Sequence, residues 1–137
     1  MEISNGMNRE KLLKHLVSLM FFLFIANILA NRFYLYYTVW WFDIMMHFLA
    51  GFWVGLFFLY VFYDKKIFSK KSLAVILCVL VIGILWEVFE LYVHNYIGKE
   101  PFNFPDIIYD VFLDLLGAIS AIWYFSKKIM PGISNTV

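Results

Sequence analysis

The sequence predicts an all-α membrane protein: four transmembrane helices in an antiparallel bundle, with both termini cytoplasmic. Composition is the first of three observations behind this prediction. The 137 residues are 64% hydrophobic and 15% charged, whereas soluble domains are usually about 45–50% apolar and about 25% charged. In water, so short a chain would bury only about two thirds of its surface on folding. That is too little to hide 22% aromatic residues, so lipid is the expected solvent.

Four long apolar runs are the second observation. Each provides the roughly 20 helical residues that cross about 30 Å of hydrocarbon. Strands are a poor alternative, because the runs lack period-two alternation and four strands cannot close into a barrel. The connections are short, so we expect one domain, residues 1–137, in which consecutive helices are antiparallel neighbours. The predicted helices cover about residues 12–30, 41–63, 73–96 and 106–125.

The positions of Lys and Arg are the third observation. One side has Arg9, Lys11, Lys14, Lys65, Lys66, Lys70, Lys71, Lys127 and Lys128, and the other has Arg32 and Lys99. Cytoplasmic flanks carry the excess of basic residues, which predicts cytoplasmic termini and a multi-pass protein of the cell (inner, cytoplasmic) membrane. We expect the first run to be a retained helix and not a cleaved signal peptide, because it is long and Asn27 interrupts it.

Acids and a histidine occupy the last three predicted helices at helical spacings. They are Asp43 and His47 on 41–63, Glu87 and Glu90 on 73–96, and Asp106, Asp110 and Asp114 on 106–125. With a rise of about 1.5 Å per residue, the deeper of these side chains fall at one level in the outer half of the bilayer. The sequence therefore predicts a polar cluster near the outer face.

The free-energy cost of charge in hydrocarbon limits how these acids can be buried. An ionised carboxylate at a helix centre costs on the order of 3 kcal/mol, and these three runs contain no Lys or Arg. Several acids would have to be protonated unless a cation lies among them. Oxygen ligands with one imidazole suit a divalent cation, whether Mg, Mn, Ca, Zn or iron. The E-x-x-H pattern of di-iron carboxylate bundles is absent, which counts against that chemistry.

We therefore expect a divalent cation of unknown identity as the cofactor. The predicted ligands are His47, Glu87, Glu90, Asp110 and Asp114, with Asp106 and His94 as additional candidates. Asp43 is the candidate catalytic residue, a general base for an activated water. Structural roles compete with these assignments, because acids in a first turn, such as Asp43 and Asp106, also cap a helix. His94 could equally be an interfacial residue beside two tyrosines.

Small residues suggest where helices approach closely. Gly51 and Gly55 form a G-x-x-x-G on the second helix. Such a motif allows close helix packing, within the bundle or across a dimer. Gly117 and the alanines that follow give the last helix a similar face.

Three motifs resemble a family of small prokaryotic membrane proteins called YjdF-like and sometimes grouped loosely with VanZ-like proteins. They are D-I-M-M-H-F-L-A-G (43–51), L-W-E-V-F-E (85–90) and D-I-I-Y-D-V-F-L-D-L-L-G-A (106–118). The matching positions are Asp43, His47, Gly51, Trp86, Glu87, Glu90, Asp106, Asp110, Asp114 and Gly117. The resemblance covers roughly residues 41–122. It implies a membrane protein but no particular activity, and the link through VanZ-like proteins to glycopeptide resistance is a distant analogy.

Three functions remain open at this point. The first is a metal-dependent hydrolase or transferase acting on a lipid or lipid-linked headgroup near the outer leaflet. The second is a cation or proton transporter or channel component, which would need a path across the whole membrane. The third is a non-catalytic structural or partner-binding protein. Membrane lipids and a second copy of the chain are the expected partners. Nucleic acid is not, because the net charge is +1 and the basic residues form only short clusters.

Overall fold

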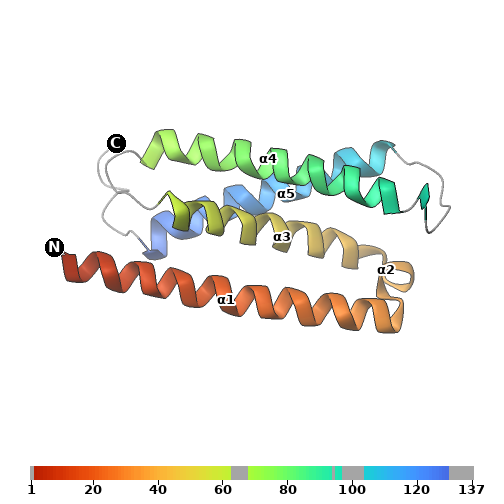
Figure 1. The fold of residues 1–137 in the computed structure, drawn as a ribbon, viewed down its shortest axis with the longest axis horizontal. Coiled ribbons are helices and arrows are strands. Elements are labelled where there is room, and N and C mark those ends of the chain that lie inside the picture. Colours follow the sequence, from red (N-terminus) through yellow and green to blue (C-terminus); the bar gives the residue numbers. More distant parts are fainter. Residues whose placement is uncertain (1, 63–67, 94, 97–103, 130–137) are drawn as a thin grey trace.

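The computed structural model describes residues 2–62, 68–93, 95–96 and 104–129, and within these the side chains of 9–62, 71–93, 95–96 and 104–129. Every regular element in these ranges is helical, as predicted, and the described residues contain no strand. The elements, in Figure 1, are α1 (Glu2–Phe33), α2 (Leu35–Thr38), α3 (Trp40–Val61), α4 (Phe68–Val93), α5 (Phe104–Tyr124) and the π-helical turn η3 (Phe125–Ile129).

In the part of the chain that the structure describes, four helices are long and apolar enough to cross a membrane, which confirms the predicted number. The spans are Arg9–Phe33, Trp40–Val61, Lys71–Val93 and Phe104–Ile129. Large apolar side chains face outward from each of them; Phe24 is 63% exposed and Val81 is 56% exposed. A soluble monomer rarely exposes apolar surface on this scale. The same surface is what hydrocarbon requires.

The bounds of the helices differ from the predicted ones at several ends. α1 extends beyond the expected 12–30 at both ends, because the helix continues through polar residues that lie outside the apolar run. The short helix α2 and the π-helical turn η3 were not predicted. The predicted end of the second helix, at residue 63, lies outside the described residues.

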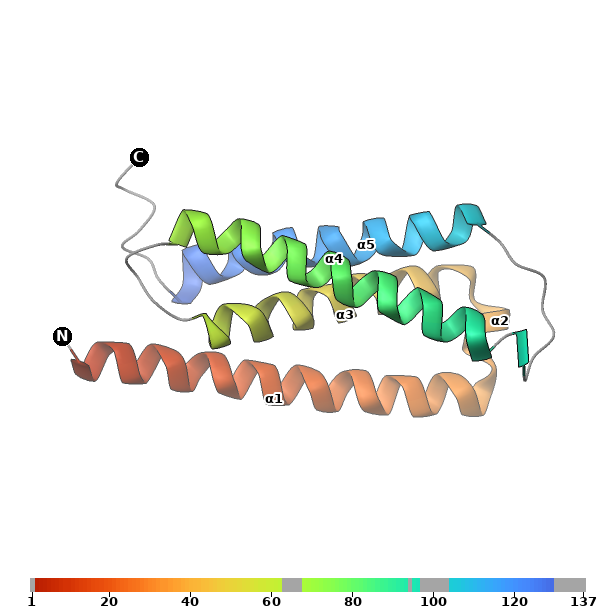
Figure 2. The same ribbon diagram turned by 45° about the horizontal axis from the view of Figure 1, so that its top comes forward.

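The helices form a bundle in which α3 contacts the three other long helices. In Figures 1 and 2, α1 begins at the end of the bundle where α3 ends, α4 begins and α5 finishes. The opposite end holds the end of α1, the short α2, the start of α3 and the start of α5. The first turns of α3 and α5 therefore lie at the same end as the last turns of α4.

Glycine residues set the distance between α3 and α5. A Cβ atom on Gly51 would overlap the backbone oxygen of Asp114, and one on Gly117 would overlap the backbone oxygen of Phe48. The two backbones therefore touch where only hydrogen fits, as small residues allow in membrane helices. Gly55 also faces α5. The G-x-x-x-G of the sequence thus serves packing within the bundle.

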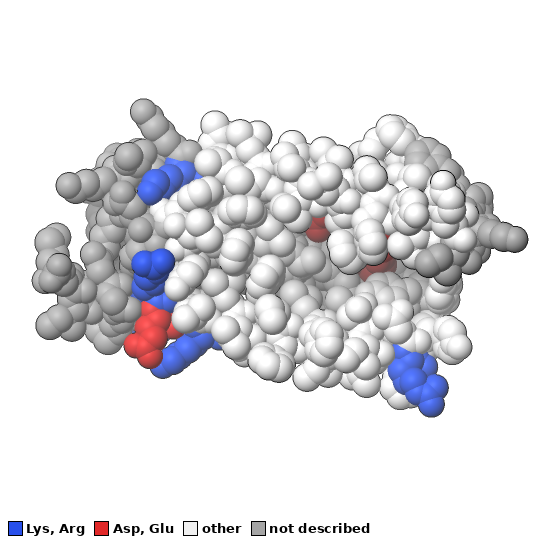
Figure 3. All heavy atoms as spheres, viewed as in Figure 1, with Lys and Arg blue, Asp and Glu red and all other residues white. Residues whose placement is uncertain are grey.

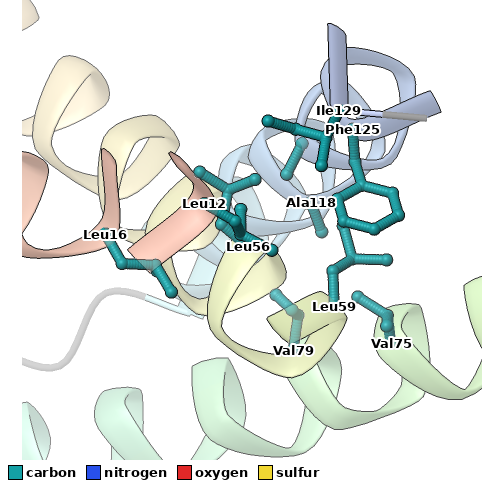
Figure 4. Packing of buried hydrophobic residues seen from close by; sticks show 10 residues of the cluster. Leu12, Leu16, Leu56, Leu59, Val75, Val79, Ala118, Phe125 and Ile129 are labelled. Carbon is teal, nitrogen blue, oxygen red and sulfur yellow. The ribbon is translucent and has the colours of Figure 1, made fainter. Parts of the chain in front are cut away.

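A cluster of buried apolar side chains fills the half of the bundle that holds the start of α1 (Figure 4). It comprises Leu12, Leu16, Leu56, Leu59, Val75, Val79, Ala118, Ala121, Phe125 and Ile129. Beside it, the indole Nε1 of Trp53 donates a hydrogen bond to the backbone oxygen of Leu16 at 2.9 Å, which joins α3 to α1. This half of the bundle interior is apolar.

Basic side chains gather at that same end of the bundle (Figure 3). Among the residues with described side chains, the Lys and Arg there are Arg9, Lys11, Lys14, Lys71, Lys127 and Lys128, while Arg32 is at the other end. Lys65, Lys66 and Lys99, which also entered the prediction of orientation, lie outside the described residues, and the side chain of Lys70 is not described.

Candidate functional site

The imidazole of His47 is the centre of the predicted cluster. Its Nδ1 lies 3.5 Å from Asp114 Oδ1 and 3.9 Å from Glu87 Oε1. Its Nε2 lies 3.8 Å from Asp43 Oδ1 and 4.0 Å from Asp110 Oδ2. Three helices, α3, α4 and α5, thus bring two acids to each ring nitrogen of one histidine.

Burial separates these acids into two kinds. The side chains of Glu87, Asp110 and Asp114 are only 6–8% exposed, whereas that of Asp43 is 40% exposed. Glu87 Oε1 is buried and has no hydrogen-bond partner among the residues that the structure describes. A buried polar atom without a partner carries a desolvation penalty of about 1–3 kcal/mol, and more when it is charged. The buried position of Glu87 therefore carries a desolvation penalty, which a ligand bound to Oε1 would remove.

Helical spacing and glycine explain how the acids reach His47. Asp43 precedes His47 by one turn on α3, and Asp110 precedes Asp114 by one turn on α5, so each pair shares a helix face. The carboxylate of Asp114 points at α4, where a Cβ on Gly83 would lie 2.9 Å from Asp114 Oδ2. The absence of a side chain at this position leaves room for that carboxylate.

Two groups of side chains could hold a metal ion. Asp43, His47 and Asp110 form one, and His47, Glu87 and Glu90 form the other, with ligand atoms in each group within 4.8 Å of one another. Hard divalent cations bind oxygen at about 2.0–2.6 Å, so ligands on opposite sides of an ion lie about 4–5 Å apart. Because a neutral imidazole has one lone pair, the two groups are alternatives for the same histidine.

A cavity of about 370 Å³ adjoins the cluster. Figure 3 shows a hollow on this face with acidic side chains at its floor. One end is apolar, and its lining includes Met20, Leu23, Phe24, Val54, Val79 and Ile82. The other end is polar and includes Asn27, Tyr36, Asp43, His47, Glu90 and Asp114. The cluster is therefore reached through a space with an apolar part and a polar part.

Tyr36 and Asn27 are site residues that sequence reasoning missed. The Tyr36 hydroxyl donates to Asn27 Oδ1 at 2.9 Å, after a turn in which Tyr34 has the left-handed conformation (φ 54°). Burial raises the pKa of the Tyr36 phenol, and the charges of Asp43 and Glu90 raise it further, so this group stays a protonated donor. Asn27 carried a usable signal, because a polar residue inside an apolar span is costly.

Of the two additional candidates, Asp106 is the one that the structure describes. Asp106 is exposed in the first turn of α5 and belongs to neither ligand group found among the described residues. That position suits a carboxylate that interacts with the helix N-terminus. His94 lies outside the described residues.

A family model described as "Predicted membrane protein (DUF2238)" matches residues 6–129. The chain belongs to this family. DUF2238 is the family known as YjdF-like, so the match confirms that resemblance, whereas the looser grouping with VanZ-like proteins is not tested by it. No curated protein and no solved structure gives a significant match. The DUF2238 match supports a membrane protein and names no activity.

Proposed function

We propose that this DUF2238 protein is a single domain that crosses the cell (inner, cytoplasmic) membrane four times as an antiparallel bundle. The clustering of basic side chains at one end of the bundle supports cytoplasmic termini, because Lys and Arg accumulate on that side. In this orientation the His47 cluster lies toward the extracytoplasmic leaflet. Its depth suits a site that meets lipid headgroups.

We infer that the cluster binds a divalent cation and that the protein is a metal-dependent hydrolase or transferase acting on a lipid or lipid-linked headgroup. The observation that carries this proposal is Glu87 Oε1, which is buried 3.9 Å from His47 Nδ1 and accepts no hydrogen bond from the described part of the chain. The stretches 40–61, 72–93 and 104–126 contain no Lys or Arg. A cation is therefore the simplest way to stabilise these carboxylates in their ionised form.

The Nδ1 side of His47 is the better place for the ion. It faces Glu87 and Asp114. Glu87 and Glu90 share a ligand group with His47, and Glu87 Oε1 has no hydrogen-bond partner among the described residues. The opposite nitrogen would then keep its hydrogen and point it toward Asp110 and Asp43. Histidine ligands are typically fixed in this way by a carboxylate that accepts from the other ring nitrogen. Asp110 thus becomes a positioning residue, and not the direct ligand that the sequence suggested.

Asp43 fits the role of general base. Its side chain is 40% exposed, against 6–8% for Glu87, Asp110 and Asp114, and it lines the polar end of the cavity. A base must reach both the attacking water and the substrate, which the deeply buried acids cannot do. A cation at this site would lower the pKa of a bound water. Asp43 lies on the Nε2 side of His47, across the ring from Glu87 and Asp114, so it would receive the proton of that water through an intervening water molecule.

The apolar half of the bundle argues against the transport hypothesis. A cation or proton path needs polar groups across the whole membrane, and charged groups inside a span line such pathways. Here the buried cluster around Leu56, Val79 and Phe125 fills the half opposite to His47. This arrangement favours a site that is entered from one side.

Elemental analysis of the detergent-purified protein tests the proposal. We expect one divalent ion per chain in the wild type and its loss in Glu87→Gln and His47→Ala. Glu10→Gln is the matched control, because Glu10 pairs with Lys14 on an exposed face of α1. Asp43→Asn should keep the metal and lose the release of headgroup products from phosphatidylglycerol, followed by mass spectrometry.

The contrary result is equally clear. A wild-type protein that contains no metal, and whose melting temperature does not change on adding Mg²⁺, Mn²⁺, Ca²⁺ or Zn²⁺, would refute the metal site. Binding to the folded state alone stabilises by about 2.7 kcal/mol at a hundredfold excess over Kd, so a real site cannot escape this measurement. That outcome would leave the cluster around His47 with a structural role only.

A further inference from the structure

The apolar part of the cavity is a groove between two helices of the bundle. Its walls come from α1 and α4, and α3 lies between them as the floor (Figure 1). Met20, Leu23 and Phe24 line it from α1, Val54 from α3, and Val79 and Ile82 from α4. At about 370 Å³, the cavity falls within the roughly 300–1,000 Å³ of small-molecule sites.

The size of the groove decides what shape of ligand fits. One turn of α-helix, about 10 Å wide and 5.4 Å long, occupies roughly 400 Å³. The cavity is thus comparable in size to a single turn of a partner helix, which is too little for a helical segment. An extended peptide is narrow enough for the groove, but its backbone groups would lie without hydrogen bonds in the lipid hydrocarbon. A slender hydrocarbon chain meets both conditions.

The medium at the mouth of the groove supplies such a chain. The walls belong to the membrane-spanning parts of α1 and α4. The outward side chains beside them are apolar, with Phe21 60% exposed and Val81 56% exposed. The polar end of the same cavity, with Tyr36 and His47, gives the space the two-part character of an amphiphile.

We propose that this groove binds one hydrocarbon chain of a membrane phospholipid and places the phosphate headgroup at the His47 end. The proposal rests on the proposed function for the headgroup, because a phosphate approaches these carboxylates only with a cation between them. The phenol of Tyr36 lies at this end, held by the hydrogen bond that it donates to Asn27 Oδ1. The substrate class is thereby narrowed to a lipid that enters sideways from the bilayer.

Two matched tryptophan substitutions on α4 test the groove. Ile82→Trp puts a large ring into the groove, whereas Ile84→Trp makes the same change on a surface that does not line it. The two isoleucines are similarly exposed, at 42% and 48%. The full-length protein is delipidated in detergent and titrated with phosphatidylglycerol, and bound lipid is counted by native mass spectrometry. We expect one tight lipid in the wild type and in Ile84→Trp.

For Ile82→Trp we expect affinity for that lipid to fall by about tenfold or more, as the loss of about two buried methylene contacts gives. Met20→Trp on the opposite wall, with Val17→Trp as its control, repeats the comparison if Ile82→Trp does not fold. Equal lipid binding by both members of each pair would overturn the proposal. So would unchanged lipid binding with a change from dimer to monomer in Ile82→Trp, which would identify a second copy as the occupant.

Metal content, measured on the same samples, separates this proposal from the proposed function. Lipid lost from Ile82→Trp with metal retained supports both. A wild type that binds one groove lipid but contains no metal refutes the metal enzyme and leaves the chain-binding groove standing. A wild type that contains metal but binds no stoichiometric lipid refutes the chain-binding groove and leaves the metal site standing.

Discussion

Gly83 offers the sharpest perturbation of the candidate site. It lies on α4 one turn before Glu87, and a Cβ added there would be 2.9 Å from Asp114 Oδ2. To restore ordinary van der Waals contact, the carboxylate must retreat by about half an ångström. It is the end of a side chain and can move without shifting α5. Gly83→Ala should therefore displace one oxygen of the site and leave the bundle intact.

The two expected effects have opposite signs. Replacing Gly by Ala inside a helix favours the helix by about 0.8–1.0 kcal/mol, so Gly83→Ala should be as stable as the wild type or slightly more stable. Functional groups must be held within about half an ångström of their productive geometry. Disturbing a metal site at this level typically costs 10–100-fold in affinity, or about 1.4–2.7 kcal/mol. Metal binding should weaken while the melting temperature of the metal-free protein holds.

Equilibrium binding of Zn²⁺ and Mn²⁺, together with thermal unfolding of the metal-free protein in detergent, measures both quantities. A double-mutant cycle with Asp114→Asn supplies the control. If Gly83 acts through Asp114, adding Gly83→Ala to Asp114→Asn should weaken metal binding little further. Full additivity of the two substitutions, or unchanged affinity in Gly83→Ala, would refute the geometry deduced for this carboxylate.

Two further predictions concern the packing that holds the site. Gly51→Ala places a Cβ against the backbone of Asp114, which cannot move aside as a side chain can. We expect the folded state to be destabilised by about 1–3 kcal/mol or more, seen as a lower melting temperature. An unchanged melting temperature would contradict the close approach of α3 and α5. Trp53→Phe removes the hydrogen bond to the Leu16 carbonyl but keeps an aromatic ring. Thermal unfolding should therefore show a decrease in stability of about 0.6–2 kcal/mol. An equal decrease in Trp123→Phe, on the exposed face of α5, would show that the hydrogen bond contributes nothing.

Most of the fold could be read from the sequence because each span is a local property. Twenty consecutive apolar residues must form a helix in hydrocarbon, whatever the rest of the chain does. The short α2 and the turn at Tyr34 could not be read in this way. A tyrosine in the left-handed region is uncommon, and no local pattern announces it. Its conformation is imposed by how α1 and α3 meet.

The candidate site, too, has a part that local spacing predicts and a part that depends on how the helices pack. Spacing of one turn places Asp43 with His47, and Asp110 with Asp114, on single helix faces, so membership of the cluster could be predicted. Which ring nitrogen each acid approaches could not, because that depends on the rotation and separation of α3, α4 and α5. Those are set by contacts such as Gly51 against the Asp114 backbone, which join residues far apart in the chain.

The same reasoning explains why candidate ligands could be predicted from the sequence and the entrance to the site could not. A groove is the space that two helices leave between them, and residues such as Met20 and Ile82 read as ordinary lipid-facing side chains until both walls are in place. Once they are, the roles of the acids separate. Glu87 and Asp114 lie buried beside Nδ1, and Asp43 stays exposed at the polar end of the cavity. Under the proposed function, buried ligands, a more exposed base and an apolar approach from the bilayer would suit a substrate that stays in the membrane.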